Sequence, residues 1–509
     1  MDAHILTWIT FIPLIGMTVI LCLPKQATGA IKGVSLAATF LPLVLATRLY
    51  FNLFKKGTAD FQFVEQAEWI KSIGAQYYVG VDGISLPLVF LTALLLFVAV
   101  PASFGIKKAE KSYYALLLLL EVGIFGVFIS LDYFLFYVFW EVMLLPMYFL
   151  IGIWGGPRRE YAAIKFFLYT LAGSVLMLVA VVALRITSGT FSIPDMINLA
   201  AGGQLTGAGL FNGGELLGMQ FTTWVFWFLF VAFAIKVPVF PFHTWLPDAH
   251  VQAPTPISVI LAGILLKLGG YGMLRACFPI VPTAFNEFAI VLAVLGVISI
   301  VYGAYVALGQ TDFKRMVAYS SVSHMGFVLL GMGALTEWGM NGAALQMFTH
   351  GTSSAAAFMI VGVIYDRAHH RDLNGFGGLA QQMPRYWALA TITFFASLGL
   401  PTMSGFVSEF MTVFGAYDSS DPRFRVLVVI SCVGIVLTAA YILWALQRIF
   451  LGNLNEKYKT LPDINFRETF AITPLLFLCI ALGIFPFFVL DWMDSSLTNL
   501  VEMLTSAGS

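Results

Sequence analysis

The segment Ala234-Ile235-Lys236-Val237-Pro238-Val239-Phe240-Pro241 ends an apolar run that begins near Thr222. A lysine and two prolines therefore stand where a helix that crosses a membrane would normally continue without a break. Proline removes a backbone hydrogen bond and clashes with the preceding turn, which frees polar backbone groups inside the apolar layer. These groups must line a cavity or find polar neighbours, so the segment predicts a broken helix inside a membrane protein.

A second interruption lies in the apolar run 387–414, which has Gly399-Leu400-Pro401 and Gly405 in its middle. As one straight helix this run would be about 42 Å long at ~1.5 Å per residue, more than a ~30 Å hydrocarbon layer requires. The two broken runs are five spans apart, and a repeat with an odd number of spans inverts its second copy. They indicate two inverted five-helix repeats, with a coincidental placement of prolines as the alternative.

The composition supports a membrane protein along the whole chain. Of the 509 residues, 59% are hydrophobic and only 11% are charged, whereas roughly 25% are charged in soluble domains. The formal net charge is zero, which gives no support for a nucleic-acid partner. Division into runs of roughly 20 residues, the length that spans the hydrocarbon layer, predicts an all-α protein with about fourteen transmembrane helices. The expected spans are 5–23, 31–51, 84–104, 113–131, 133–154, 163–183, 222–240, 257–275, 288–308, 316–335, 340–364, 387–414, 426–450 and 470–488.

These spans predict four units: 1–110 with helices one to three, 111–280 and 281–452 as the two repeats, and 453–509 with helix fourteen and a tail. Most of the 27 Lys and Arg residues then fall on one side, in clusters such as 107–111, 367–371 and 457–459. Cytoplasmic loops carry such an excess. We therefore expect both termini on the non-cytoplasmic side of the membrane.

Four charged residues lie deep inside apolar runs: Glu141, Lys236, Lys267 and Glu409. At about 2.5 to 3.5 kcal/mol for each such group near a helix centre, together they oppose insertion by on the order of 10 kcal/mol, so they must face one another, water or the bundle interior. Glu121, His324 and His350 are further candidates. Burial shifts the proton affinity of such groups and an opposite charge shifts it back, which favours a proton relay. The alternatives are buried ion pairs or histidine hydrogen bonds that only hold helices together.

Metal and redox chemistry are not expected in this chain. The four cysteines are far apart in apolar runs and form no ligand spacing; they are Cys22, Cys277, Cys432 and Cys479. The pair His369-His370 lies in a charged loop and indicates a solvated turn. For His243 and His250, which flank Pro247-Asp248, we favour a capping or access role over metal ligation.

Several long motifs resemble one family. They are Phe240-Pro241-Phe242-His243-Thr244-Trp245-Leu246-Pro247-Asp248-Ala249-His250 with the following Ala253-Pro254-Thr255-Pro256 and Lys267, then Phe139-Trp140-Glu141 with Pro146, and Ala318-Tyr319-Ser320-Ser321-Val322-Ser323-His324. Together they resemble the antiporter-like proton-translocating subunits of respiratory complex I, over essentially the whole chain. Two features distinguish this chain among the members that it resembles. The chain ends soon after span fourteen without a long lateral helix, and Glu409 stands where other members more often carry lysine.

The resemblance implies a role for each buried group. Glu141 would pair with Lys236 in the first half-channel, Lys267 would be the central relay, His324 and His350 would connect the halves, and Glu409 would be the far terminal group. It also implies transfer of protons from the cytoplasm to the opposite side of a bacterial inner membrane, without redox chemistry in this chain.

The expected partners are the lipid bilayer and the other complex I membrane subunits, especially neighbouring antiporter-like subunits. NADH, FMN, iron-sulfur clusters and quinone would be bound by partner subunits. Three rival functions remain: a subunit of a multi-subunit sodium/proton antiporter, a structural scaffold without a proton path and, most distant, a membrane enzyme, for which no nucleophile-base pair or metal set appears at the span ends.

Overall fold

The computed structural model describes residues 4–207, 210 and 214–507. The chain is nearly all helical, with two small β-hairpins. Its first half contains α1 (Ile5–Cys22), α2 (Thr28–Arg48), β1 (Gln62–Ile70), β2 (Ala75–Val81), α3 (Ser85–Ala102), α4 (Glu110–Ile129), α5 (Tyr133–Trp154), α6 (Arg159–Ser188), α7 (Ile193–Ala201), β3 (Glu215–Leu216), β4 (Met219–Gln220), α8 (Phe221–Lys236), α9 (Trp245–Gln252), α10 (Thr255–Ile260) and α11 (Leu266–Gly272).

The second half contains α12 (Pro282–Leu308), α13 (Phe313–Gly333), α14 (Glu337–Ala368), α15 (Leu379–Gln382), α16 (Pro384–Leu398), α17 (Ser404–Tyr417), α18 (Arg423–Phe450), α19 (Phe466–Ile484) and α20 (Phe487–Ser506). Three π-helical turns, η2 (Leu49–Leu53), η5 (Leu261–Leu265) and η6 (Met273–Cys277), continue α2, α10 and α11. Short 3₁₀ turns form η3 (Ser103–Gly105), η7 (Leu373–Gly375) and η8 (Glu456–Tyr458).

The predicted all-α membrane bundle is confirmed. Among the described residues, twelve helices are long and apolar enough to cross a membrane. The other two expected spans are the broken ones: α8 stops at Lys236 before the turn that leads into α9, and the twelfth span divides into α16 and α17. Gly399 ends α16 with a φ of 75°, a conformation that favours glycine.

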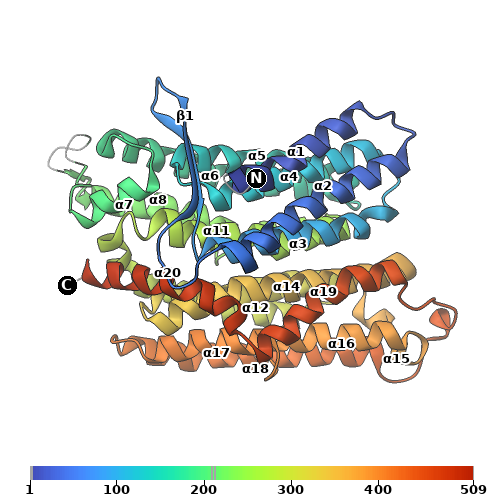
Figure 1. Ribbon diagram of the computed structural model, residues 1–509. Helices are drawn as coiled ribbons and strands as arrows, with labels where there is room; N and C mark the ends of the chain where they lie inside the picture. The colour runs from blue at the N-terminus through green and yellow to red at the C-terminus, as the bar shows by residue number, and fades with distance from the viewer. Residues whose placement is uncertain (1–3, 208–209, 211–213, 508–509) are drawn as a thin grey trace.

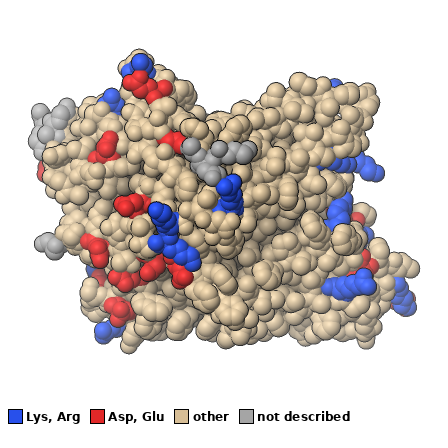
Figure 2. All heavy atoms as spheres, viewed as in Figure 1, with Lys and Arg blue, Asp and Glu red and all other residues tan. Residues whose placement is uncertain are grey.

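The helices lie side by side along one direction, with α1 to α11 in the upper half of Figure 1 and α12 to α18 in the lower half. Helices α19 and α20 contact both halves. On the face shown in Figure 2, charged side chains gather toward the two ends of the helices and leave a band without charge between them. This distribution is the one that a hydrocarbon layer around the middle of the bundle requires.

Two matching backbone contacts support the inverted repeats. Asp132 caps the start of α5, and Tyr133 N donates to Phe191 O over 2.8 Å. Asp312 caps the start of α13 in the same way, and Phe313 N donates to Arg371 O over 2.9 Å. Helix α5 is the second span of the first repeat and α13 the second span of the second. The two caps therefore lie at opposite ends of the bundle, as inverted copies require.

We expect replacement of Asp312 by alanine to lower the stability of the protein. The Asp312 carboxylate accepts a hydrogen bond from Arg315 N at 3.0 Å and also pairs with Arg371 at 3.1 Å. Loss of a helix cap costs about 1 kcal/mol, and Asp312→Ala also leaves Arg371 without this partner. Thermal unfolding of the solubilised protein measures the effect. Asp60→Ala, at an exposed position, is the control, and an equal melting temperature for Asp312→Ala and the control would contradict the expectation.

Two elements differ from the sequence-based expectation. The β1–β2 hairpin lies between the second and third spans, in a segment too polar to be found as a membrane span. The expected C-terminal tail is the amphipathic helix α20, whose buried residues include Trp492, Met493 and Leu500. Its acidic residues Asp491 and Asp494 lower its hydropathy, so a search for apolar runs does not detect it.

Candidate functional site

A chain of buried polar groups crosses the centre of the bundle. Lys267 Nζ on α11 lies 2.7 Å from His350 Nδ1 on α14. The ring centres of His350 and His324 are 5.6 Å apart, and His324 Nδ1 on α13 lies 2.8 Å from Glu409 Oε1 on α17. None of the four side chains belongs to a residue that is more than 5% exposed. The structure therefore brings together four of the six predicted site residues, from four different helices.

The helix that carries Lys267 has an irregular backbone at this position. The π-helical turn η5 ends two residues before Lys267, and the ammonium donates to Ala262 O within this turn. Segments of π-helix recur at functional sites. Here the wide turn holds the ammonium with a backbone carbonyl on one side and His350 on the other.

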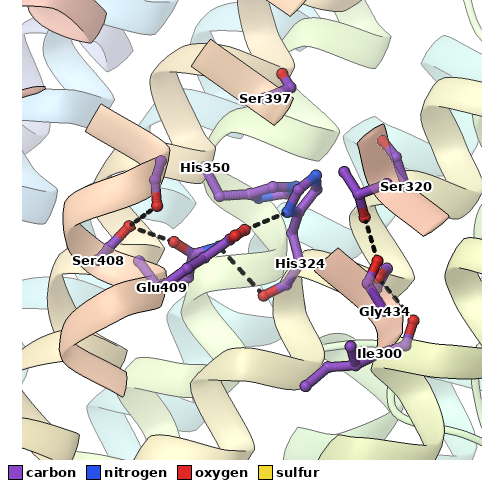
Figure 3. Close-up of polar contacts among 12 residues, drawn as sticks. Ile300, Ser320, His324, His350, Ser397, Ser408, Glu409 and Gly434 are labelled. Atoms are coloured by element: carbon purple, nitrogen blue, oxygen red, sulfur yellow. Dashed lines mark hydrogen bonds and ion pairs between the residues drawn. The ribbon is translucent and has the colours of Figure 1, made fainter. Parts of the chain in front are cut away.

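A second layer of polar side chains surrounds Glu409. Gln346 Nε2 donates to Glu409 Oε1 at 3.4 Å, and Ser408 Oγ donates to Gln346 Oε1. Thr349 Oγ1 lies 2.9 Å from Ser408 Oγ. Figure 3 shows this cluster beside the contact between His324 and Glu409. These hydrogen bonds fix the carboxylate that faces the histidine.

Sequence reasoning missed Gln346, Thr349 and Ser408. A signal for two of them was present, because Gln346, Thr349, His350 and Ser353 repeat at the spacing of one helical face in an otherwise apolar run. Ser408 had no such signal beyond its place next to Glu409.

In the first half of the site, the charged side chains make fewer direct polar contacts than in the second half. Lys236 is 2% exposed, and its Nζ lies 5.3 Å from the centre of the Trp140 ring and 5.5 Å from that of Phe166. No ion pair within 4.0 Å joins Lys236 to Glu141 among the described residues, and Glu141 Oε1 has no hydrogen-bond partner there. The expected direct pairing is therefore absent from this structure, and aromatic faces hold the ammonium instead.

An ion pair that the sequence did not indicate lies near this half. Lys165 Nζ on α6 is 2.7 Å from Asp248 Oδ2 on α9, and both side chains are about one-fifth exposed. The neighbouring hydroxyls of Tyr169 and Thr244 are 2.7 Å apart. These contacts tie α9, the segment after the first break, to α6.

The remaining candidates make few polar contacts. Glu121 is fully buried, and neither of its carboxylate oxygens has a hydrogen-bond partner among the described residues. His250 stacks on Phe358 with ring centres 4.4 Å apart, and His243 stacks on Phe240 at 5.8 Å. Neither histidine caps a helix, so the capping alternative is wrong, and the access role stays a prediction. Within the described part of the chain no group of His, Cys, Asp or Glu is arranged to hold a metal ion.

Comparison with known proteins gives consistent results. Residues 130–438 match the family described as NADH:quinone oxidoreductase/Mrp antiporter, TM. The chain is 41% identical to NADH-quinone oxidoreductase subunit M of Rickettsia prowazekii (strain Madrid E), over 98% of this chain and 99% of that protein.

Solved structures share the fold. A chain of respiratory complex I from Thermus thermophilus with bound NADH matches with a TM-score of 0.85 at 28% identity, over 99% of this chain and 100% of that chain. A chain of the Mrp complex from Dietzia sp. DQ12-45-1b matches with a TM-score of 0.80 at 22% identity, over 98% of this chain and 55% of that one. At this identity the second likeness shows the fold alone.

Ammonium, imidazole and carboxyl groups in contact across a bundle of membrane helices define a protein of the proton-carrying class, because each can gain or lose a proton. The chain belongs to the NADH:quinone oxidoreductase/Mrp antiporter transmembrane family. The resemblance drawn from the motifs is confirmed, and within the family the chain is similar to proteins named subunit M.

Proposed function

We propose that this chain is a proton-translocating membrane-arm subunit of an NADH-quinone oxidoreductase. The observation that carries the proposal is the line of contacts Lys267–His350–His324–Glu409. Only the gap between the two histidine rings lacks a direct hydrogen bond, and imidazole can take up a proton on one nitrogen and release one from the other. In this role the chain performs no redox chemistry itself.

Proton transfer in the first half involves Glu141, Lys236 and Lys267. Because Glu141 and Lys236 are separated here, a charge change in a neighbouring subunit can alter the interaction between them and so alter the proton affinity of Lys236. The altered charge of Lys236 then changes the proton affinity of Lys267, and Glu409 is the terminal group of the path. The direction, from the cytoplasm to the opposite side, follows from the family.

Partners and location follow from membership in the complex. The chain is a multi-pass membrane subunit among other membrane subunits of complex I, with antiporter-like subunits as its neighbours. We place it in a bacterial inner membrane with both termini on the non-cytoplasmic side. NADH, FMN, iron-sulfur clusters and quinone belong to partner subunits in this proposal.

We expect Lys236→Ala to reduce proton pumping severalfold in the assembled complex. The substitution removes the ammonium that lies between Trp140 and Phe166, and with it the group whose proton affinity is proposed to respond to Glu141. Quinone-dependent NADH oxidation and proton uptake by vesicles are measured together. Lys71→Ala is the matched control, because its side chain is 80% exposed. Unchanged pumping at normal assembly would favour the structural scaffold.

The sodium/proton antiporter remains the second candidate, supported by the shared fold of the Mrp complex. Purification of the complex separates the two. Co-purification of flavin-containing subunits supports the oxidoreductase, and their absence from an intact, active complex supports the antiporter.

A further inference from the structure

A small cavity lies beside the histidine pair, between α13, α14, α16 and α18. Its volume is about 10 Å³, which is room for one water molecule at most. Hydroxyl side chains from four helices line it along with the two imidazoles. These hydroxyls belong to Ser320, Ser353, Ser354, Ser397 and Tyr441.

Three buried polar atoms of the residues that line this cavity have no hydrogen-bond partner among the described residues: Nε2 of His324, Nε2 of His350 and the Tyr441 hydroxyl. Tyr441 is fully buried. Leaving a buried polar group without a partner is costly, and three such atoms around one cavity point to a common partner. The Nδ1 atoms of both histidines already contact Glu409 and Lys267, so the Nε2 atoms are the ones available.

The cavity lies on the side of the histidines that faces one end of the bundle. On α13 it is lined by Met316, Val317 and Ser320, which lie between the start of this helix and His324. On α14 it is lined by Ser354 and Ala357, which lie between His350 and the end of this helix. The start of α13 and the end of α14 meet where Phe313 N donates to Arg371 O. In Figure 3, Ser320 lies on the side of His324 away from Ser408 and Glu409.

We propose that this cavity holds one water molecule and forms a second branch of the proton path, with Tyr441 as a further relay residue. The inference rests on the proposed function. The water joins the Tyr441 hydroxyl to Nε2 of His324 or His350. Tyr441 gives its hydroxyl proton to the water, the water gives one to Nε2, and the imidazole releases another from Nδ1.

Tyr441 regains its proton from the Ser320 hydroxyl, which takes one in turn from solvent at the Arg371 end. The imidazole, left as its other tautomer, exchanges its remaining proton from Nε2 back to Nδ1, so every group returns to its starting state. Its position suits this exchange, because Tyr441 and Ser320 line the same cavity as the two histidines. The branch therefore joins the histidine pair to the Arg371 end without passing through Lys236 or Lys267.

Tyr441→Phe in the assembled complex tests the proposal. We expect NADH-driven proton pumping to fall about fivefold, the effect of roughly one lost hydrogen bond on a barrier, while the melting temperature stays unchanged. The removed hydroxyl has no hydrogen-bond partner among the described residues. Tyr386→Phe is the control: this tyrosine is also buried, but its hydroxyl donates to Ile360 O at 2.9 Å and lies away from the cavity. It should lower stability and leave pumping per assembled complex unchanged.

Ala357→Val provides a second variant, because it adds carbon atoms to the cavity wall and keeps every proton carrier. It should reproduce the loss in pumping by excluding water. Normal pumping in both Tyr441→Phe and Ala357→Val would overturn the second branch, and so would a loss explained by poor assembly alone. If Lys267→Ala still abolished pumping, the proposed function would stand without the branch; normal pumping in all three variants would overturn both.

Discussion

We expect Lys267→Met to reduce the rate of proton translocation at least about tenfold, while the complex still assembles. The ammonium is fully buried and contacts only Ala262 O and His350 in the described structure. Methionine has a similar length but carries no proton, so the chain of contacts to His350 is broken. Since each ~1.4 kcal/mol added to a barrier slows a reaction tenfold, loss of one desolvated proton carrier suffices for this effect.

The thermal stability of the Lys267→Met protein should stay the same or rise, although its pumping activity falls. A buried ammonium is costly to desolvate, and its replacement by an apolar side chain is often neutral or stabilising. We therefore expect an equal or higher melting temperature for Lys267→Met. Lys267→Arg separates charge from proton transfer, because the guanidinium stays protonated. A scaffold tolerates arginine, whereas a relay does not. Full pumping by either variant would rule out Lys267 as the central relay.

Glu409→Gln is expected to cause the second largest loss, again about tenfold or more, because a neutral amide takes up no proton at physiological pH. The amide keeps the shape of the side chain and can still form hydrogen bonds with His324 and Gln346. The effect is thus confined to proton transfer. Measurement of pumping per NADH oxidised, in membranes with equal amounts of complex, detects it.

The matched control is Glu456→Gln, whose side chain is 87% exposed and paired with Lys459. It should pump at the normal rate. If Glu409→Gln did so as well, Glu409 would act by holding helices together, and the terminal group of the path would have to be sought elsewhere.

The sequence allowed the fold to be predicted because each membrane span is an apolar run with recognisable residues at its ends. The expected span 133–154 coincides with α5, since Asp132 caps its start and Gly155 follows its end. Elements with mixed polarity escaped the same search. The β1–β2 hairpin and the amphipathic helix α20 acquire their apolar contacts only after the bundle forms.

For the site, the sequence identified the residues but not all of their partners. Lys267, His324, His350 and Glu409 were expected because charge and imidazole are rare at membrane depth. Which of these residues contact one another depends on how α11, α13, α14 and α17 are oriented about their axes. Hydropathy does not encode this orientation. The separation of Glu141 from Lys236 and the ion pair between Lys165 and Asp248 arise from the same long-range packing.

The direction of the central line of contacts has an electrical consequence. Lys267, His350 and His324 each lie near the middle of a long membrane-crossing helix, so a proton passing among them moves mainly sideways, within the plane of the bilayer. A full crossing against 100 mV requires about 2.3 kcal/mol per charge, but lateral motion crosses little of that voltage. The membrane potential therefore acts chiefly on the steps that bring the proton into the central line of contacts and out of it. The rate of transfer among Lys267, His350 and His324 should depend little on the membrane potential.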